Sequence, residues 1–520
     1  MKLIKSATVL TALAAALLLS ATPAAQAANG PGVAWQAPSA DGNVDPYFAR
    51  AKAEKKPLLL YWGAKWCPPC NQLKATLFNR ADFIEQSKAY IAVSIDGDAP
   101  GAQKLGARFK VSGYPTLILF NPNGGEITRL PGETDAAQVM GILQLGLSGG
   151  RSVKDVLADA LSGKHLSANE WRLLSFYGWD SDEQQLVAQS ERAALLARLV
   201  KASEGGNGEI TTRLWLKSIA AMGKGKTADP DQLPRLRAVL KDPVQARGLM
   251  DVLTDLAPDL VLAFAPQNGE RRASLVADFE LALKRFNQDA SLSRADRLDA
   301  LLSRVELARM DVAQDEMHPS IPAPLLAEVR EQVGKIDREL TNAYERQAVI
   351  SGAAFVLSRA GLWTESDDLL KAGLARSHSA YYLMSHLAGN AMKQGRKAEA
   401  LHWYGEAFDK SEGFATRLQW GSTFLGALVE VSPNDTARIE STASQLFSEA
   451  AKDPGAFYER SEASLKKVAR LLSKWNQGPT QAAAVDRLKT QLDGVCGTLN
   501  SDARAKSSCD DLMKSAVRKG

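Results

Sequence analysis

The stretch "YWGAKWCPPC", residues 61–70, places two cysteines three positions apart, directly after an apolar run. That run, Leu58–Trp62, has the length and composition of a buried strand. A helix is predicted after the cysteines, because Leu73 and Leu77 lie four residues apart and share one helix face. The pattern therefore predicts that Cys67 stands where a strand ends and a helix begins.

A cysteine at a helix N-terminus is suited to thiol chemistry. The unsatisfied N–H groups and the dipole of the helix favour a negative charge there and lower the pKa of a thiol. Cys67 is therefore predicted to be the attacking and more exposed sulfur. Cys70 lies on the same helix face, close enough to resolve a mixed disulfide. The pair indicates thiol-disulfide exchange.

The residues around this motif alternate between helix and strand from Asp45 to about Gly146. The predicted helices and strands are a helix 47–56 ended by Pro57, strand 58–62, the helix after the cysteines, strand 90–95, helix 102–109, strands 116–120 and 126–130 joined by the turn 121–124, and helix 135–147. This order predicts a small α/β domain.

"WGAKWCPPC" followed by "VSGYPTLILFNPNG" closely resembles the thioredoxin superfamily over roughly residues 40–147. The segment "EKKPLLLYWGAKWCPPC" looks most like periplasmic thioredoxin-like domains, including those that terminate membrane thiol:disulfide interchange proteins. The sequence "GYPT" also occurs in protein disulfide isomerases. The resemblance implies a central mixed sheet flanked by helices. It also implies a cis Pro115 facing the sulfurs, and a substrate-binding groove at Trp66, Tyr114 and Pro115 where the main chain of Tyr114 pairs with an extended peptide.

One position departs from the family pattern. Thioredoxins carry a buried aspartate six residues before the first cysteine, and Tyr61 stands there in this chain. No carboxylate evident in the sequence replaces it. The departure argues against a role as a fast general reductase.

Other roles for the cysteine pair are weaker. Zinc would need two further ligands at suitable spacing, and a structural disulfide across so small a loop constrains the unfolded chain little. We therefore predict a redox pair with no metal and no cofactor. Pro68 and Pro69 remove two N–H donors, but the dipeptide does not fix a reduction potential; the motif leans towards a reductase or an isomerase.

The first 27 residues have the pattern of a cleavable signal peptide: Lys2 and Lys5, an apolar stretch 7–19, and a small-residue site ending at Ala27. No later stretch is long and apolar enough to span a membrane. With 63 basic and 59 acidic residues, the chain lacks the strongly basic balance of nucleic-acid-binding proteins. We expect an exported, periplasmic protein that neither spans the membrane nor binds nucleic acid.

Beyond residue 150 the sequence reads as helices. Ser167 with Glu170, and Ser181 with Gln184, fit capping boxes, and breaks occur at 204–208, 223–233 and 318–324.

A 34-residue shift superposes Gly361 on Gly395 and several small and apolar positions around them. This spacing, clearest in "NAMKQGRKAEALHWYGEAF", resembles the tetratricopeptide repeat. Two helical hairpins with coincident spacing are the alternative. The predicted domains are a signal peptide 1–27, a thioredoxin-like domain 28–147, an all-helical region 152–340 and a tetratricopeptide-like region 341–520.

Cys496 and Cys509 lie in "CGTLNSDARAKSSC" near the C-terminus. A structural disulfide there would close a loop of about 14 residues. A second dithiol exchanging electrons with Cys67 is the alternative, and it requires the tail to reach back to the first domain.

The sequence therefore predicts an exported thiol-disulfide oxidoreductase that acts on protein substrates and is renewed by a redox partner protein. The competing hypothesis is a non-catalytic binding or scaffold protein that works through its helices, with the thioredoxin-like domain as a recognition module. A thiol peroxidase would also depend on Cys67, but no peroxidase-type context is evident.

Overall fold

Strand β1 (Leu58–Gly63) lies inside a four-stranded mixed sheet with the order β2-β1-β3-β4. In this computed structural model, which describes residues 32–39, 42–130, 135–147, 149–313 and 315–514, β1 pairs in parallel with β2 (Ile91–Asp96) and antiparallel with β3 (Thr116–Phe120). β3 pairs antiparallel with β4 (Glu126–Leu130). The predicted mixed sheet is confirmed.

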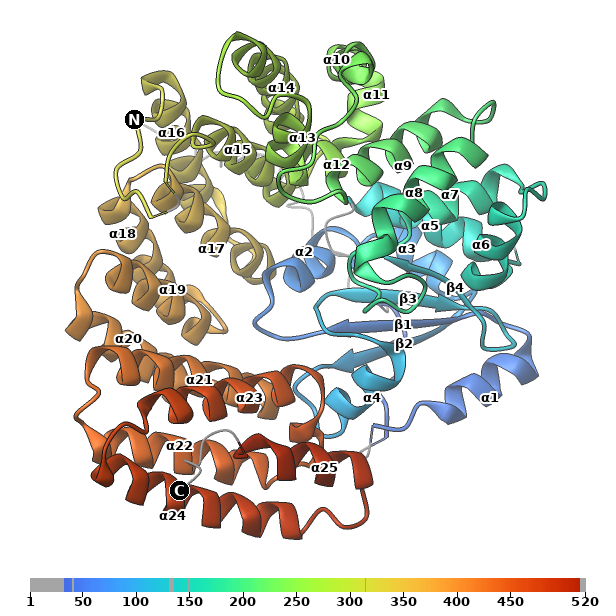
Figure 1. The fold of residues 1–520 in the computed structure, drawn as a ribbon. Helices are drawn as coiled ribbons and strands as arrows, with labels where there is room; N and C mark the ends of the chain where they lie inside the picture. Colours follow the sequence, from blue (N-terminus) through green and yellow to red (C-terminus); the bar gives the residue numbers. More distant parts are fainter. Residues whose placement is uncertain (1–31, 40–41, 131–134, 148, 314, 515–520) are drawn as a thin grey trace, which may run out of the picture. The chain divides into compact units, whose positions relative to one another are not determined.

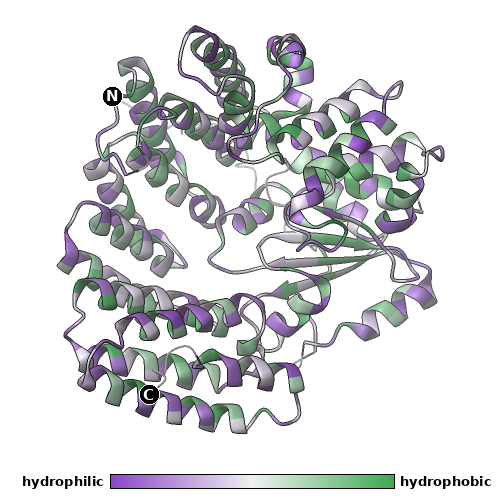
Figure 2. Cartoon of the chain, in the orientation of Figure 1, coloured by the Kyte–Doolittle hydropathy of each residue, from purple (hydrophilic) through white to green (hydrophobic). Residues whose placement is uncertain are grey.

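Helices cover both faces of this sheet (Figure 1). Helices α2 (Pro68–Thr76), α3 (Ala81–Ser87) and α5 (Ala136–Leu147) bury apolar residues on one face. Helices α1 (Asp45–Glu54) and α4 (Ala102–Phe109) pack on the other. Every side chain of β1 is buried, as expected for a strand covered on both sides, and Figure 2 shows the apolar character of the sheet.

Most of these helices and strands were predicted from the sequence. The predicted bounds of α4, β3 and β4 agree with the structure, and α1 lies two residues earlier than predicted. Helix α3 was not predicted: it has seven residues, and its N-cap residue Arg80 provides no side-chain cap.

From residue 151 to residue 514 the described part of the chain contains helices and no strand. The α-helices are α6 Val153–Leu161, α7 Ala168–Phe176, α8 Arg192–Ala202, α9 Gly208–Ala220, α10 Leu233–Lys241, α11 Pro243–Gly248, α12 Met250–Asp255, α13 Ala257–Phe264, α14 Glu270–Gln288, α15 Arg294–Ala308, α16 Ala323–Glu339, α17 Ala343–Arg359, α18 Trp363–Gly373, α19 Ala380–Lys393, α20 Lys397–Lys410, α21 Phe414–Val431, α22 Thr436–Ala450, α23 Glu459–Trp475, α24 Pro479–Gly497 and α25 Ala503–Leu512. Short 3₁₀ helices are η1 Gln189–Glu191, η2 Pro230–Gln232, η3 Leu374–Arg376 and η4 Pro454–Phe457.

One of the two predicted capping boxes is confirmed. Ser167 and Glu170 cap α7 reciprocally. The prediction at Ser181 and Gln184 is wrong, because the carboxylate of Asp182 accepts the backbone N–H groups of Gln184 and Leu186 and holds the segment in turns.

The 34-residue spacing corresponds to two successive helical hairpins, α17–α18 and α19–α20. Gly361 and Gly395 stand at the turns with φ of 82° and 72°, a conformation that favours glycine. The residues superposed by the shift lie at equivalent places in the two hairpins; the closer assignment to tetratricopeptide repeats stays a prediction.

The predicted signal peptide, residues 1–27, lies outside the described residues. Among the residues that the structure does describe, no helix has both the length and the apolar character needed to cross a membrane.

Candidate redox site

Cys67 and Cys70 form a disulfide at the start of α2, with an S–S distance of 2.08 Å. Cys67 is the N-cap residue of the helix. Pro68 and Pro69 have no N–H group, so the first available donor is the backbone N–H of Cys70, which lies 3.2 Å from the Cys67 sulfur and donates to it. A helix N-terminus aimed at this sulfur favours its thiolate form when the disulfide is reduced.

The side chain of Asn71 fixes the loop that carries Cys67. Its Nδ2 donates to the carbonyl oxygens of Lys65, at 2.9 Å, and of Cys67, at 2.8 Å. Asn71 is fully buried. Sequence reasoning missed this residue, although an amide just inside a helix that begins with two prolines is a suitable donor to the turn before it.

The Tyr114–Pro115 peptide bond is cis, as the family resemblance implied. Pro115 is buried and immediately precedes β3, which pairs with β1. The hydroxyl of Tyr114 accepts a hydrogen bond from Gln103 Nε2 at 2.8 Å. The loop before β3 is therefore held against α4.

Tyr61 occupies the position of the family's buried aspartate and lies within the apolar layer under α2. Burial and the charge of Asp96 raise its pKa well above the usual range. Within the described residues its hydroxyl has no hydrogen-bond partner. Tyr61 therefore remains protonated and is not a proton acceptor at neutral pH.

Asp98 is the carboxylate that sequence reasoning missed. Its Oδ2 accepts a hydrogen bond from Trp66 Nε1 at 3.0 Å, so it contacts the residue directly before Cys67. Burial raises the pKa of Asp98, although hydrogen bonds from Thr416 and Trp66 favour its charged form. No sequence motif marks this residue, because its partners come from distant segments.

Cys67 was predicted to be the more exposed of the two sulfurs, and both sulfurs are buried in the structure. Cys67 is 2 % exposed and Cys70 is 0 % exposed. Trp66, predicted to line the substrate groove, is 8 % exposed. The physical reason is that helices from the second half of the chain pack against this face, with α17 directly beside α2 (Figure 1).

Cys496 and Cys509 form a second, separate disulfide that links α24 to α25. Both residues are buried among apolar side chains. Among the described residues there is no group of three or more His, Cys, Asp or Glu side chains arranged to hold a metal ion.

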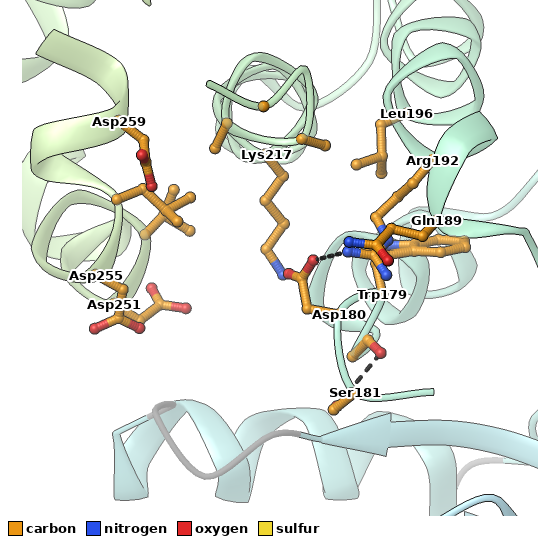
Figure 3. Close-up of a pocket in the computed structure, with 16 residues that line it drawn as sticks. Trp179, Asp180, Ser181, Gln189, Arg192, Leu196, Lys217, Asp251, Asp255 and Asp259 are labelled. Atoms are coloured by element: carbon orange, nitrogen blue, oxygen red, sulfur yellow. Dashed lines mark hydrogen bonds and ion pairs between the residues drawn. The ribbon is translucent and has the colours of Figure 1, made fainter. Parts of the chain in front are cut away.

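A cavity of about 570 Å³ lies elsewhere, between the turn 178–181 and helices α9, α12 and α13 (Figure 3). Its charged side chains include Arg192, which pairs with Asp180, and Asp251, which pairs with Arg213. None of the predicted site residues lines it.

The geometry and the comparisons agree on the class of this region. A family model for the thioredoxin-like domain matches residues 44–146. These residues therefore form a thioredoxin-like domain, and its Cys67–Cys70 pair has the C-x-x-C spacing.

Curated relatives match part of the chain. The chain is 32% identical over 120 residues to thiol:disulfide interchange protein DsbD 2 of Pseudomonas aeruginosa, covering 22% of this chain and 20% of that protein. It is 34% identical over 98 residues to thiol:disulfide interchange protein DsbD of Yersinia pestis, covering 18% of this chain and 16% of that protein. The chain thus spans only 16–20% of the length of these relatives.

Proposed function

We propose that this protein is an exported thiol-disulfide oxidoreductase that exchanges disulfides with protein substrates, as a reductase or isomerase. The observation that carries the proposal is the hydrogen bond from the Cys70 N–H to the Cys67 sulfur at the N-terminus of α2. This hydrogen bond supports Cys67 as the sulfur that the helix stabilises as an anion. The likeness to thiol:disulfide interchange proteins supports the same chemistry.

In the proposed reaction the reduced protein donates two electrons. The Cys67 thiolate attacks one sulfur of a substrate disulfide, and the other substrate sulfur leaves as a thiolate. The Cys70 thiolate then attacks the Cys67 sulfur, which forms the internal disulfide and releases the second substrate thiol. A dithiol partner protein reduces the internal disulfide and is itself oxidised.

Trapping tests the proposal. A Cys70→Ala variant keeps the attacking sulfur but cannot resolve the mixed disulfide, so exported proteins should accumulate in covalent complexes that reductant releases. The matched Cys67→Ala variant should trap far fewer. If the two variants trap the same proteins in equal amounts, the assigned roles are wrong.

A non-catalytic binding protein is the second candidate, and the burial of both sulfurs favours it. In that case the helices bind the partner and the disulfide is inert. A Cys67→Ser/Cys70→Ser variant separates the candidates: it abolishes mixed-disulfide complexes and disulfide-dependent phenotypes under the first and leaves them unchanged under the second.

The proposed export has its own measurement. Mass spectrometry of the protein isolated from the periplasm should find a mature N-terminus at Ala28. An intact Met1 in that fraction contradicts cleavage at this site.

A further inference from the structure

The groove that the family resemblance assigns to substrate is occupied by this chain's own helices. The ring of Trp66 stacks on Tyr382 of α19, with centroids 5.5 Å apart and planes 20° apart. Trp420 of α21 meets the same ring edge-on at 6.3 Å. These two rings and the guanidinium of Arg460 of α23 all pack on Trp66, and together they form the aromatic cover.

Arg460 connects the two sides of the groove. Its guanidinium lies 5.1 Å from the centroid of Trp66 and 4.7 Å from that of Tyr114. Its backbone N–H donates to the side chain of Gln103, which in turn holds the Tyr114 hydroxyl. A cation between two rings is a favourable contact away from water, so it holds the cover over both substrate-binding residues.

Asp98 anchors the cover a second time. It accepts hydrogen bonds from the backbone N–H of Thr416 at 2.9 Å and from its hydroxyl at 2.8 Å. Thr416 is fully buried and lies in the first turn of α21, where N–H groups favour a negative partner. The same carboxylate binds Trp66. One buried charge thus joins the cysteine loop to the helix that carries Trp420.

Gly413, the N-cap residue of α21, permits this close approach. Its φ is 86°, and a Cβ placed there would clash with the Cβ of Asp98. A side chain at this position would push α21 away from Asp98.

We infer that the helical region keeps the redox site closed, and that disulfide exchange requires the aromatic cover and the start of α21 to move off Trp66. This inference rests on the proposed function and concerns the regulation of the same site. Exchange needs a third sulfur to approach the S–S bond. In the closed state, burial of Cys67 blocks that approach.

Once the aromatic cover has moved away, a dithiol protein can reduce the Cys67–Cys70 disulfide. Its thiolate attacks the Cys67 sulfur, the Cys67–Cys70 bond breaks, and Cys70 leaves as a thiolate. The second thiol of the partner then attacks the mixed disulfide and releases Cys67. The partner is oxidised and this protein is reduced by two electrons.

The test measures how fast dithiothreitol reduces the Cys67–Cys70 bond in the full-length native protein. Alkylation and peptide mapping separate this bond from Cys496–Cys509. Gly413→Ala should be reduced about tenfold faster than the wild type, which corresponds to a shift of about 1.4 kcal/mol towards the open state.

Gly269→Ala is the matched control. Gly269 is also an N-cap glycine with positive φ, 151°, but a Cβ there meets nothing within 4 Å. Its reduction rate should equal that of the wild type. If both variants are reduced equally fast, strain in the chain and not contact with Asp98 is responsible, and the inference is overturned.

Thr416→Val provides a second variant should Gly413→Ala fail to fold. It keeps the shape of the side chain and removes the hydroxyl donor to Asp98. It should also speed reduction without unfolding the protein, as checked by circular dichroism. A wild-type disulfide that is reduced as fast as in the guanidinium-unfolded chain overturns the inference.

Reduction of insulin separates this inference from the proposed function. Faster reduction of the loosened variants by dithiothreitol, with no insulin reduction by any of them, supports the cover and contradicts the proposed function. Insulin reduction with no difference between variants supports the function and contradicts the cover.

Discussion

The side chain of Gln347 donates a hydrogen bond to the backbone carbonyl of Trp66 at 2.9 Å, across 281 residues of sequence. Its own oxygen accepts a hydrogen bond from the hydroxyl of Ser377 at 2.7 Å. Gln347 is buried, so no bulk water replaces either partner. The carbonyl next to the redox cysteine is therefore held by a side chain of α17.

Replacing Gln347 by Met keeps the length of the side chain and removes this donor. We expect a loss of about 1–3 kcal/mol in the free energy of unfolding, because the Trp66 carbonyl stays buried. Urea unfolding measures the loss. Gln394→Met is the control, since Gln394 donates within its own helix turn, to the carbonyl of Asn390. Equal stability of the two variants would show that the contact with Trp66 contributes nothing.

Arg213 and Asp251 form a buried bidentate ion pair, with N–O distances of 2.6 and 3.0 Å. Burial by itself raises the pKa of Asp251, but the Arg213 guanidinium outweighs it and holds the pKa below the usual range. Arg213→Met should destabilise the fold by about 3–5 kcal/mol, because it leaves a buried carboxylate unpaired. Calorimetry of the single variant and of Arg213→Met/Asp251→Asn checks this: the double variant should lose less, and an equal loss argues against an unpaired charge.

His386 lies on α19 against the ring of Tyr382, with centroids 5.0 Å apart. Burial, with the nearby charge of Lys393, lowers its pKa to about 4 from 6.5. On acidification the unfolded chain therefore takes up the proton first. The stability associated with neutral His386 is complete above pH 6.5 and is lost as the pH falls towards 4, by about 3 kcal/mol at most.

Guanidinium unfolding at several pH values tests this dependence. His386→Phe should flatten the stability profile between pH 6.5 and 4, whereas replacement of the exposed His165 by Asn should not. A profile that His386→Phe leaves unchanged would assign the acid sensitivity to other groups.

The Cys496–Cys509 disulfide is predicted to be structural. A Cys496→Ala/Cys509→Ala variant should lose about 3 kcal/mol of stability, because the closed loop no longer restricts the unfolded chain. Its rate of protein disulfide exchange should equal that of the wild type. Loss of exchange in a folded variant would instead favour the alternative of a second redox pair.

Local sequence signals predicted the fold of residues 44–146 well, because each element there is marked within a few positions: alternating apolar runs, Pro57, the turn 121–124. The helix α3 carried no such mark, since Arg80 does not cap it. The error at Ser181 arose because a neighbouring aspartate competed for the same N–H groups.

The covering of the cysteines could not be predicted from those signals. Asp98, Thr416 and Gln347 look like ordinary polar residues in their own segments, and they become important through partners more than 280 positions away. A single sequence holds no information on which distant helix faces the groove. The sequence therefore predicted the chemistry of Cys67 but not its burial.

The separation of Trp66 and Gln347 in the sequence also sets a delay during synthesis of the chain. A ribosome adds about 5–20 residues each second, so the 281 residues between them take roughly 15–55 s to synthesise. During that interval the growing chain carries both cysteines without the helices that later bury them. Other proteins can therefore reach the newborn dithiol before the finished molecule closes over it.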